Sequence, residues 1–221
     1  MLEKRLEVKA DGKKVYDIII RDTFEGLAKE LAPFGTEERK LCIVTERNVS
    51  SYYLNEVQEI LEKVSARVDI FIFQEGEASK NLDTVSQLYR YLIQHEYDRK
   101  DMLVALGGGV VGDLTGFAAA TYLRGIDFVQ VPTSLLSQVD SSIGGKTGVD
   151  FQCYKNMVGA FYMPKLVYIN INTLKTLSER EFHSGLGEVI KHGLIRDKEY
   201  YNWIRENKEA IAEREPEAMA V

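Results

Sequence analysis

The segment Met102-Leu-Val-Ala-Leu-Gly-Gly-Gly-Val-Val-Gly-Asp113 carries the clearest fold signal in the chain. Its apolar run, residues 102–106, is typical of a strand buried on both faces, and the residues that follow the glycines have helical spacing. Gly107, Gly109 and Gly112 match G-x-G-x-x-G, a turn that lets a backbone approach a pyrophosphate at a helix N-terminus. A tight glycine turn without a ligand is the alternative.

The same alternation of apolar strands and amphipathic helices runs through most of the chain. We expect strands at residues 16–20, 40–45, 68–73, 102–106, 128–131 and 166–171, with helices at 25–31, 52–64, 81–94 and 111–123. This order predicts an α/β fold with a Rossmann-like parallel sheet, helices on both faces, and ligands bound beyond the carboxyl ends of the strands. We assign this domain to residues 1–176.

Residues 177–221 have helical periodicity and no strand pattern, so we expect them to be the start of an all-α C-terminal domain. Ser178 stands where a helix cap would be. The pattern runs to Val221 without a stop signal, and we therefore expect the chain to be the first part of a longer protein. We also expect apolar surface to be exposed around Trp203 and Ile204.

Composition excludes several classes of protein. The 221 residues are 45% hydrophobic with a net charge of −6, which indicates a globular chain and, without a basic stripe, argues against nucleic-acid binding. No apolar stretch approaches the roughly 18 residues of a membrane span. Cys42 and Cys153 have neither disulfide-framework nor metal-ligand spacing, so we expect reduced thiols in a cytoplasmic protein.

Polar residues follow four of the predicted strands at their carboxyl ends. They lie in segments 46–48, 75–80, the glycine turn and 132–134. The acidic ribose ligand that usually follows G-x-G-x-x-G by about 20 residues is absent, because Val131 to Thr133 stand there. A dinucleotide would therefore need a carboxylate from 46–48 or 75–80, although each of these loops alone is more simply a solvated turn.

Residues 138–156 form a polar segment with three glycines, two lysines and two aspartates, and we expect a loop outside the core. A P-loop is not indicated, since G-x-x-x-x-G-K-[ST] needs a glycine where Val139 and Asp140 stand. Lys146 and Lys155 are candidates for holding an anion, because an ammonium group is a compact charge for phosphate. A solvated loop with unremarkable lysines is the alternative.

Glu188, Lys191 and His192 are spaced three and four residues apart and would share one face of a helix. A carboxylate and an imidazole one turn apart could share a metal, but two ligands do not make a site and H-E-x-x-H is absent. A surface histidine is the simpler interpretation of His192. The other two histidines, His95 and His183, acquire no role from the sequence.

Taken together, these motifs resemble 3-dehydroquinate synthase, a family of the sugar-phosphate cyclase superfamily. The matching segments run collinearly from about Glu46 to Ile195 and comprise 107–116, 122–125, 131–136, 138–150, 155–156 and 187–191. The resemblance implies a homodimeric, two-domain enzyme of the shikimate pathway that uses NAD and a divalent metal, zinc or cobalt. The implied reaction converts 3-deoxy-D-arabino-heptulosonate 7-phosphate to 3-dehydroquinate and phosphate, by transient oxidation, phosphate elimination, re-reduction and intramolecular aldol closure.

The resemblance also implies roles for individual positions. The implied NAD contacts are Glu46, Asn48, Glu77, Lys80, Gly108, Gly109, Asp113, Thr133, Ser134, Lys146, Lys155, Thr173 and Thr176. The implied substrate or catalytic residues are Asp140, Lys146, Asn156 and Lys191, together with Arg124, which would reach a phosphate in the partner subunit's site. Glu188 would be one metal ligand, with the remaining ligands outside this chain. Glu46 and Ser134 depart from the aspartate and threonine that are usual in the family.

Three hypotheses remain open at the level of sequence. The chain is part of a 3-dehydroquinate synthase, or a nucleotide-binding module without chemistry, or a relative such as another sugar-phosphate cyclase or a glycerol-type dehydrogenase. Residues 140–150 with Lys155 and Asn156 favour the cyclases over the dehydrogenases. For the isolated chain we expect NAD binding but negligible turnover, because one carboxylate cannot hold a catalytic metal.

Overall fold

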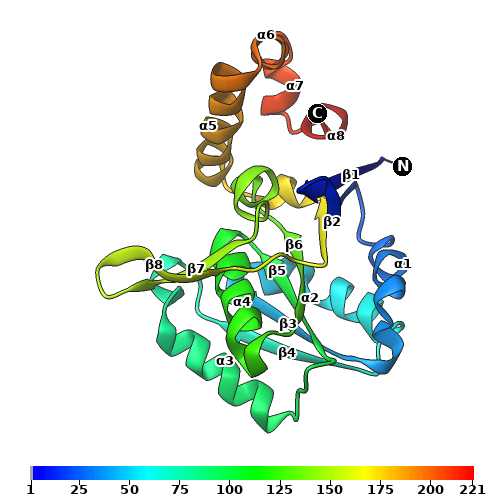
Figure 1. The fold of residues 1–221 in the computed structure, drawn as a ribbon. Helices are drawn as coiled ribbons and strands as arrows, with labels where there is room; N and C mark the ends of the chain where they lie inside the picture. Colours follow the sequence, from blue (N-terminus) through cyan, green and yellow to red (C-terminus); the bar gives the residue numbers. More distant parts are fainter. Residues whose placement is uncertain (1) are drawn as a thin grey trace.

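A seven-stranded sheet forms the centre of the protein (Figure 1). The computed structural model describes residues 2–221, and the strands lie in the order β1-β2-β9-β6-β5-β3-β4. They are β1 (Glu3–Ala10), β2 (Lys13–Arg21), β3 (Lys40–Glu46), β4 (Arg67–Phe73), β5 (Met102–Gly107), β6 (Asp127–Pro132) and β9 (Leu166–Asn170). β1 runs antiparallel to β2, whereas the neighbours from β2 to β4 are parallel. The predicted α/β fold with a Rossmann-like parallel sheet is confirmed, and β1 is the one antiparallel strand of the seven described.

Helices cover both faces of this sheet, as the sequence predicts. α1 (Leu27–Leu31) and α2 (Arg47–Glu62) pack on one face, and α3 (Leu82–Gln94) and α4 (Gly109–Thr121) pack on the other. Along β5, Leu103 belongs to the core beneath α3 and α4, whereas Val104 belongs to the core beneath α1 and α2. Burial on both faces explains why this strand is continuously apolar.

The edge strand β1 is not predicted by the sequence, because its side chains are mostly exposed and polar. Ion pairs take the place of apolar burial there. Arg5 contacts Asp17 on β2 at 2.6 Å and Glu30 on α1 at 2.5 Å. Charged side chains on an edge strand also discourage pairing with other chains.

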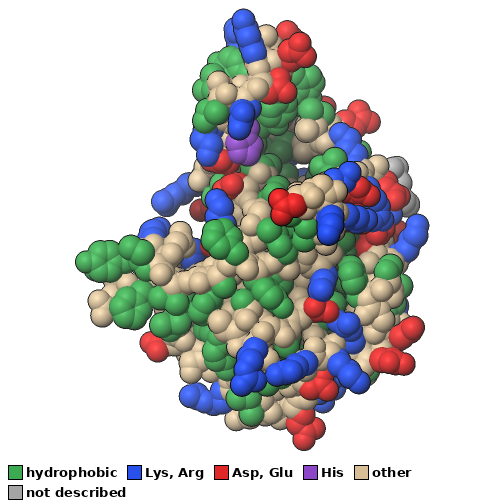
Figure 2. All heavy atoms as spheres, in the orientation of Figure 1, with side chains coloured by type: hydrophobic (Ala, Val, Ile, Leu, Met, Phe, Trp, Pro, Cys, Tyr) green, Lys and Arg blue, Asp and Glu red, His purple; other side chains and the backbone are tan. Residues whose placement is uncertain are grey.

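Residues 138–156 are not the loop that their polarity predicts. They enter through a π-helical turn, Ser137–Ser141, and continue as a hairpin of β7 (Lys146–Phe151) and β8 (Tyr154–Phe161). Thr147, Gly148 and Val149 of β7 are buried, whereas Lys146 stays exposed. Part of this polar segment therefore contributes to the packed interior. It projects from the sheet, and hydrophobic side chains gather on it (Figures 1 and 2).

Beyond β9 the chain turns through a 3-10 helix, Ile171–Thr176, into a helical lobe (Figure 1). The lobe consists of α5 (Glu179–Arg196), α6 (Lys198–Glu206), α7 (Lys208–Ala212) and α8 (Pro216–Met219). No strand occurs between Asn170 and Val221, so the all-helical pattern predicted for residues 177–221 is confirmed. None of the helices between residues 2 and 221 has the length and hydropathy of a membrane span.

The expected exposure around Trp203 and Ile204 is wrong. Ile204 is only 7% exposed, because α7 and α8 fold back over α6 and place Ile211 and Met219 in the same small core. Most of the exposed apolar side chains of the lobe lie on α5 instead, where Leu194 is 64% exposed, and Val221 is exposed as well.

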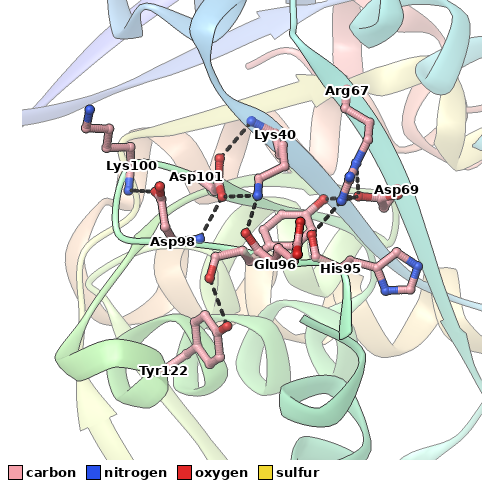
Figure 3. A network of polar contacts seen from close by, with 10 residues as sticks. Lys40, Arg67, Asp69, His95, Glu96, Asp98, Lys100, Asp101 and Tyr122 are labelled. Atoms are coloured by element: carbon pink, nitrogen blue, oxygen red, sulfur yellow. Dashed lines mark hydrogen bonds and ion pairs between the residues drawn. The ribbon is translucent and has the colours of Figure 1, made fainter. Parts of the chain in front are cut away.

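A polar network ties together the amino ends of β3, β4 and β5 (Figure 3). The buried Asp101 carboxylate accepts hydrogen bonds from the backbone N–H groups of Lys40 at 2.8 Å and Asp98 at 2.7 Å. The hydroxyl of Tyr97 donates to Asp69 at 2.9 Å. The polar groups of this network pair with one another at the amino edge of the sheet. The predicted site residues lie at the opposite, carboxyl edge.

Candidate functional site

The site lies at the carboxyl edge of the sheet, where the strand order reverses. β3 lies between β4 and β5. The chain that leaves β3 crosses to β4 on one side, and the chain that leaves β5 crosses to β6 on the other, so the two connections diverge between β3 and β5. Ligands of open α/β sheets bind in the crevice outside such a point. Glu46 ends β3 there and Gly108 directly follows β5, while Thr133 and Thr173 follow the neighbouring β6 and β9.

The glycine turn leaves the N-terminus of α4 open. Gly108 is the N-cap in an extended conformation, and no side chain caps the free N–H groups of the first turn. A Cβ on Gly107 would clash with Val111, and a Cβ on Gly108 or Gly109 would crowd a serine hydroxyl. Glycine at these positions therefore preserves a cradle of backbone donors at the positive end of a helix dipole, which fits a pyrophosphate.

A cleft of about 510 Å³ is lined by residues of α4, of the π-helical turn and of the hairpin, which packs against α4 where Gly116 meets Thr147. Four residues to which the resemblance assigns roles line it, namely Asp113, Asp140, Lys146 and Asn156. The remaining lining residues are Ser141, Ile143, Thr147, Gly148, Gly159, Ala160 and Phe161. The hairpin thus supplies one wall of the cleft, which the predicted polar loop outside the core would not provide.

A chain of charges runs from the cleft to the loop after β4. Lys80 Nζ lies 2.8 Å from Asp113 Oδ2 and 3.8 Å from Glu77 Oε1, and Lys155 Nζ approaches the same Glu77 oxygen at 3.4 Å. Burial raises the pKa of the Asp113 carboxyl above its ordinary value, and the ammonium group of Lys80 opposes that rise. The four predicted cofactor residues therefore form one continuous network.

Glu46 is the last residue of β3 and the N-cap of α2, and Asn48 lies in the first turn of that helix, where the sequence predicts a loop. α2 begins at Arg47, five residues before the predicted start, because the Glu46 carboxylate caps it. It accepts hydrogen bonds from the backbone N–H groups of Asn48 at 2.8 Å and Val49 at 2.9 Å. Each carboxylate oxygen keeps a further lone pair for a ribose hydroxyl.

The residues after β6 and β9 are joined by hydrogen bonds. Gln138 Nε2 donates to Thr173 Oγ1 at 3.0 Å, and the Tyr53 hydroxyl contacts Thr176 and donates to the Thr173 carbonyl at 3.1 Å. Ser134 Oγ donates to Ser137 Oγ at 2.9 Å. The sequence does not single out Gln138 or Tyr53, because both lie outside the strand-end loops.

Arg124 lies outside the cleft. It follows the far end of α4, and a helix of 13 residues places its two ends about 18 Å apart. The side chain is exposed, and the backbone adopts a positive φ of 69°. The structure therefore does not bring Arg124 to the cleft of its own chain.

Glu188, Lys191 and His192 share one face of α5, as predicted. Glu188 Oε1 contacts Lys191 Nζ and lies 3.0 Å from His192 Nε2. Lys191 and, more weakly, His192 hold the pKa of the Glu188 carboxyl below its ordinary value. None of the three lines the cleft.

The described residues do not form a complete metal site. Between residues 2 and 221 there is no group of three or more histidine, cysteine, aspartate or glutamate side chains that could hold an ion. Glu188 and His192 supply two such groups at most, and a catalytic zinc site takes three protein ligands.

Residues 70–184, slightly more than half of the chain, match the family described as 3-dehydroquinate synthase N-terminal. The chain is 49% identical over 199 residues to a 3-dehydroquinate synthase of Ruminiclostridium cellulolyticum, covering 90% of this chain and 55% of that protein. It spans about half the length of the curated relatives it matches.

Solved structures give the same picture of the fold. A 2-deoxy-scyllo-inosose synthase complexed with carbaglucose-6-phosphate, NAD+ and Co2+ matches with a TM-score of 0.81 at 26% identity, over 100% of this chain and 62% of that one. A 2-epi-5-epi-valiolone synthase from Streptomyces hygroscopicus subsp. jinggangensis, with NAD+ and Zn2+ bound, matches with a TM-score of 0.82 at 27% identity, over 97% and 60% of the two chains. Glycerol dehydrogenase from Schizosaccharomyces pombe, at 16% identity and a TM-score of 0.63, shares the fold alone.

Proposed function

Because the chain belongs to the 3-dehydroquinate synthase family, we propose that it is the NAD-binding part of an enzyme that makes 3-dehydroquinate and phosphate from 3-deoxy-D-arabino-heptulosonate 7-phosphate. The observation that carries the proposal is the cleft beside the glycine turn. It brings Asp113, Asp140, Lys146 and Asn156 together from a helix, a π-helical turn and two strands of a hairpin.

NAD would lie along the carboxyl edge of the sheet. The free N–H groups of Gly108 and Gly109 would hold its pyrophosphate, and the carboxylate of Glu46 or Glu77 would accept ribose hydroxyls. When bound, NAD supplies an acceptor that takes a hydride from the substrate and returns it. Lys80 keeps the Asp113 carboxylate in place beside this path.

The substrate would occupy the cleft next to the cofactor. Lys146 and Asn156 face it from the hairpin, and Asp140 faces it from the π-helical turn. The ammonium group of Lys146 would hold an anionic group of the substrate and offset the negative charge that builds up as phosphate leaves. Asp140 would accept a hydrogen bond from a substrate hydroxyl and so fix its orientation.

Three further assignments belong to the same proposal. Arg124 would reach the phosphate bound in the partner subunit's cleft, since it cannot reach the cleft of its own chain, and the enzyme would be a homodimer. Lys191 would contact substrate from α5. Glu188 would contribute one ligand to a divalent metal whose other ligands lie outside this chain. Reduced thiols at Cys42 and Cys153 agree with a cytoplasmic enzyme.

The alternatives are less well supported. Identity to a 3-dehydroquinate synthase is 49%, against 26% and 27% to synthases of other cyclic products, which favours the heptulosonate as substrate. Glycerol dehydrogenase resembles the chain in fold alone. A nucleotide-binding module without chemistry would not need an aspartate, a lysine and an asparagine in the same cleft.

Calorimetric titration of the 221-residue chain with NAD+ tests the cofactor part of the proposal. We expect saturable binding, and absence of saturation at millimolar NAD+ would overturn it.

Phosphate release from the heptulosonate, assayed in the full-length protein with NAD+ and with or without a chelator, tests the reaction. We expect release that the chelator abolishes, and we expect negligible release from the 221-residue chain alone. Failure of the full-length protein to release phosphate with metal and NAD+ present would refute the assignment.

A further inference from the structure

Ser141 lies in an unusual piece of backbone at the edge of the cleft. The turn Ser137–Ser141 is π-helical, and the N–H of Ser142 donates to the carbonyl of Ser137 at 3.2 Å. A π-helical turn holds one more residue than an α-helical one and is frequent at functional sites. Here it places two consecutive residues, Asp140 and Ser141, in the lining of the cleft.

The hydroxyl of Ser141 has no hydrogen-bond partner within the described residues, although its Oγ atom is buried. The nearby hydroxyls of Ser134 and Ser137 satisfy one another at 2.9 Å. A buried hydroxyl without a partner is uncommon because its desolvation is not repaid by a hydrogen bond. The Ser141 side chain as a whole is half-buried and lines the cleft, so rotation about its Cα–Cβ bond would turn the hydroxyl towards a ligand there, which can supply the missing partner.

The position of Ser141 identifies the part of the ligand involved. Its Oγ lies 3.0 Å from the point that a Cβ on Gly109 would occupy, and Gly109 is the first residue of α4. On the other side of the turn, Ser134 Oγ lies 3.2 Å from the corresponding point of Gly108. The Ser141 hydroxyl is thus beside the helix N-terminus that attracts phosphate oxygens.

We propose that the Ser141 hydroxyl donates a hydrogen bond to the pyrophosphate of NAD at the N-terminus of α4. This assignment rests on the proposed function and adds to it a cofactor contact that the sequence motifs do not indicate. It also gives the π-helical turn a role, because the turn directs Asp140 towards the substrate and Ser141 towards the cofactor from adjacent positions.

The neighbouring serine provides a matched control. Ser142 is fully buried and its hydroxyl also lacks a partner within the described residues, but it does not line the cleft. The Ser141→Ala and Ser142→Ala variants of the 221-residue chain are titrated calorimetrically with NAD+ and with ADP-ribose, and thermal unfolding confirms that both fold. ADP-ribose keeps the pyrophosphate and lacks the nicotinamide.

We expect Ser141→Ala to weaken the binding of both ligands about tenfold, the usual size for a hydrogen bond to a charged group, and Ser142→Ala to leave both unchanged. Equal weakening by both variants would mean that the turn is disturbed and would overturn the assignment. Weakening for NAD+ but not for ADP-ribose would place the contact at the nicotinamide end and would also overturn it. If wild-type protein binds NAD+ and Ser141→Ala binds it equally well, this inference fails while the proposed function stands. If wild-type protein binds neither ligand, both fail.

Discussion

Lys80 Nζ lies 2.8 Å from Asp113 Oδ2 beside the cleft, and the Lys80 side chain is only 5% exposed. The pair joins the loop after β4 to the first turns of α4, two segments that the sequence keeps 33 residues apart. Burial alone would favour the neutral form of Asp113, so the stability of the ionised carboxylate depends on this single ammonium group.

Replacing Lys80 by methionine should therefore destabilise the protein in a pH-dependent way. The variant leaves Asp113 in its site without a cation, so the pKa of its carboxyl rises further above the unfolded value. When the pKa of a carboxyl is raised in the folded state, its ionisation lowers the free energy of unfolding. The loss should be about 2 kcal/mol at pH 7 and should shrink as the pH falls through the raised pKa towards the unfolded value near 4. Urea unfolding at several pH values measures it, and a pH-independent loss would contradict the reasoning.

The glycine turn allows binding and stability to be separated. Gly109→Ala places a methyl group 3.0 Å from Ser141 Oγ, inside the space proposed for the pyrophosphate. We expect NAD+ affinity to fall at least tenfold while the chain stays folded, since alanine is a better helix former than glycine.

Gly187→Ala is the matched control for that experiment. A Cβ at Gly187 on α5 would meet nothing within 4 Å. This variant should gain about 0.5–1 kcal/mol of unfolding free energy and bind NAD+ normally. If Gly109→Ala bound NAD+ as well as Gly187→Ala does, the turn would not hold the cofactor.

At the amino edge of the sheet, a substitution should lower stability without changing NAD+ affinity. Asp101→Ala removes the acceptor for two backbone N–H groups and an ion pair with Lys40 at 3.3 Å (Figure 3). We expect a loss of about 3 kcal/mol in unfolding free energy with NAD+ affinity unchanged in the folded protein. The exposed Glu37→Ala should change stability by less than about 0.5 kcal/mol. A change in NAD+ affinity for Asp101→Ala would show that the two edges are coupled.

The central strands could be predicted because burial on both faces leaves an unmistakable apolar run, as in β5. The edge strand β1 could not, since Arg5 and its neighbours are held by ion pairs whose partners are distant in sequence. The hairpin could not be predicted for a related reason. It is built around the close approach of Gly148 and Gly159, where a Cβ on Gly159 would clash with the Thr147 carbonyl, and glycine carries no strand signal of its own.

The site shows the same division between local and distant information. The glycine turn and the carboxyl-edge position of Glu46 follow from local patterns and strand order. The resemblance supplied the positions of Asp140, Lys146 and Asn156, but only the folded hairpin shows that they line one cleft. Ser141 left no signal at all, because a serine in a polar segment is ordinary until its hydroxyl is seen to be buried and unpaired.

The two cysteines should differ sharply in reactivity. Cys42 is fully buried in β3, and burial raises the pKa of its thiol well above the ordinary value, whereas Cys153 is exposed between β7 and β8. Since the thiolate is the reactive form, a disulfide reagent should label one thiol per native chain and two after denaturation. The Cys153→Ser variant should show no rapid labelling. Rapid labelling of that variant would contradict the burial of Cys42.

Glu188 should be ionised at neutral pH, as a metal ligand must be. Lys191 and His192 depress the pKa of its carboxyl, so their stabilising effect is present above the unfolded value near 4.3 and is lost as the pH falls through the lower folded value. Lys191→Met should raise the carboxyl pKa towards its ordinary value, and His192→Gln should raise it less, because Lys191 is the larger cause. A carbon-13 NMR titration of the Glu188 carboxyl measures both shifts, with Lys198→Met on α6 as the control expected to change nothing. Equal titration curves for wild type and Lys191→Met would show that the contact on α5 does not persist in solution, and Glu188 would then reach any metal without a neighbouring cation to hold it ionised.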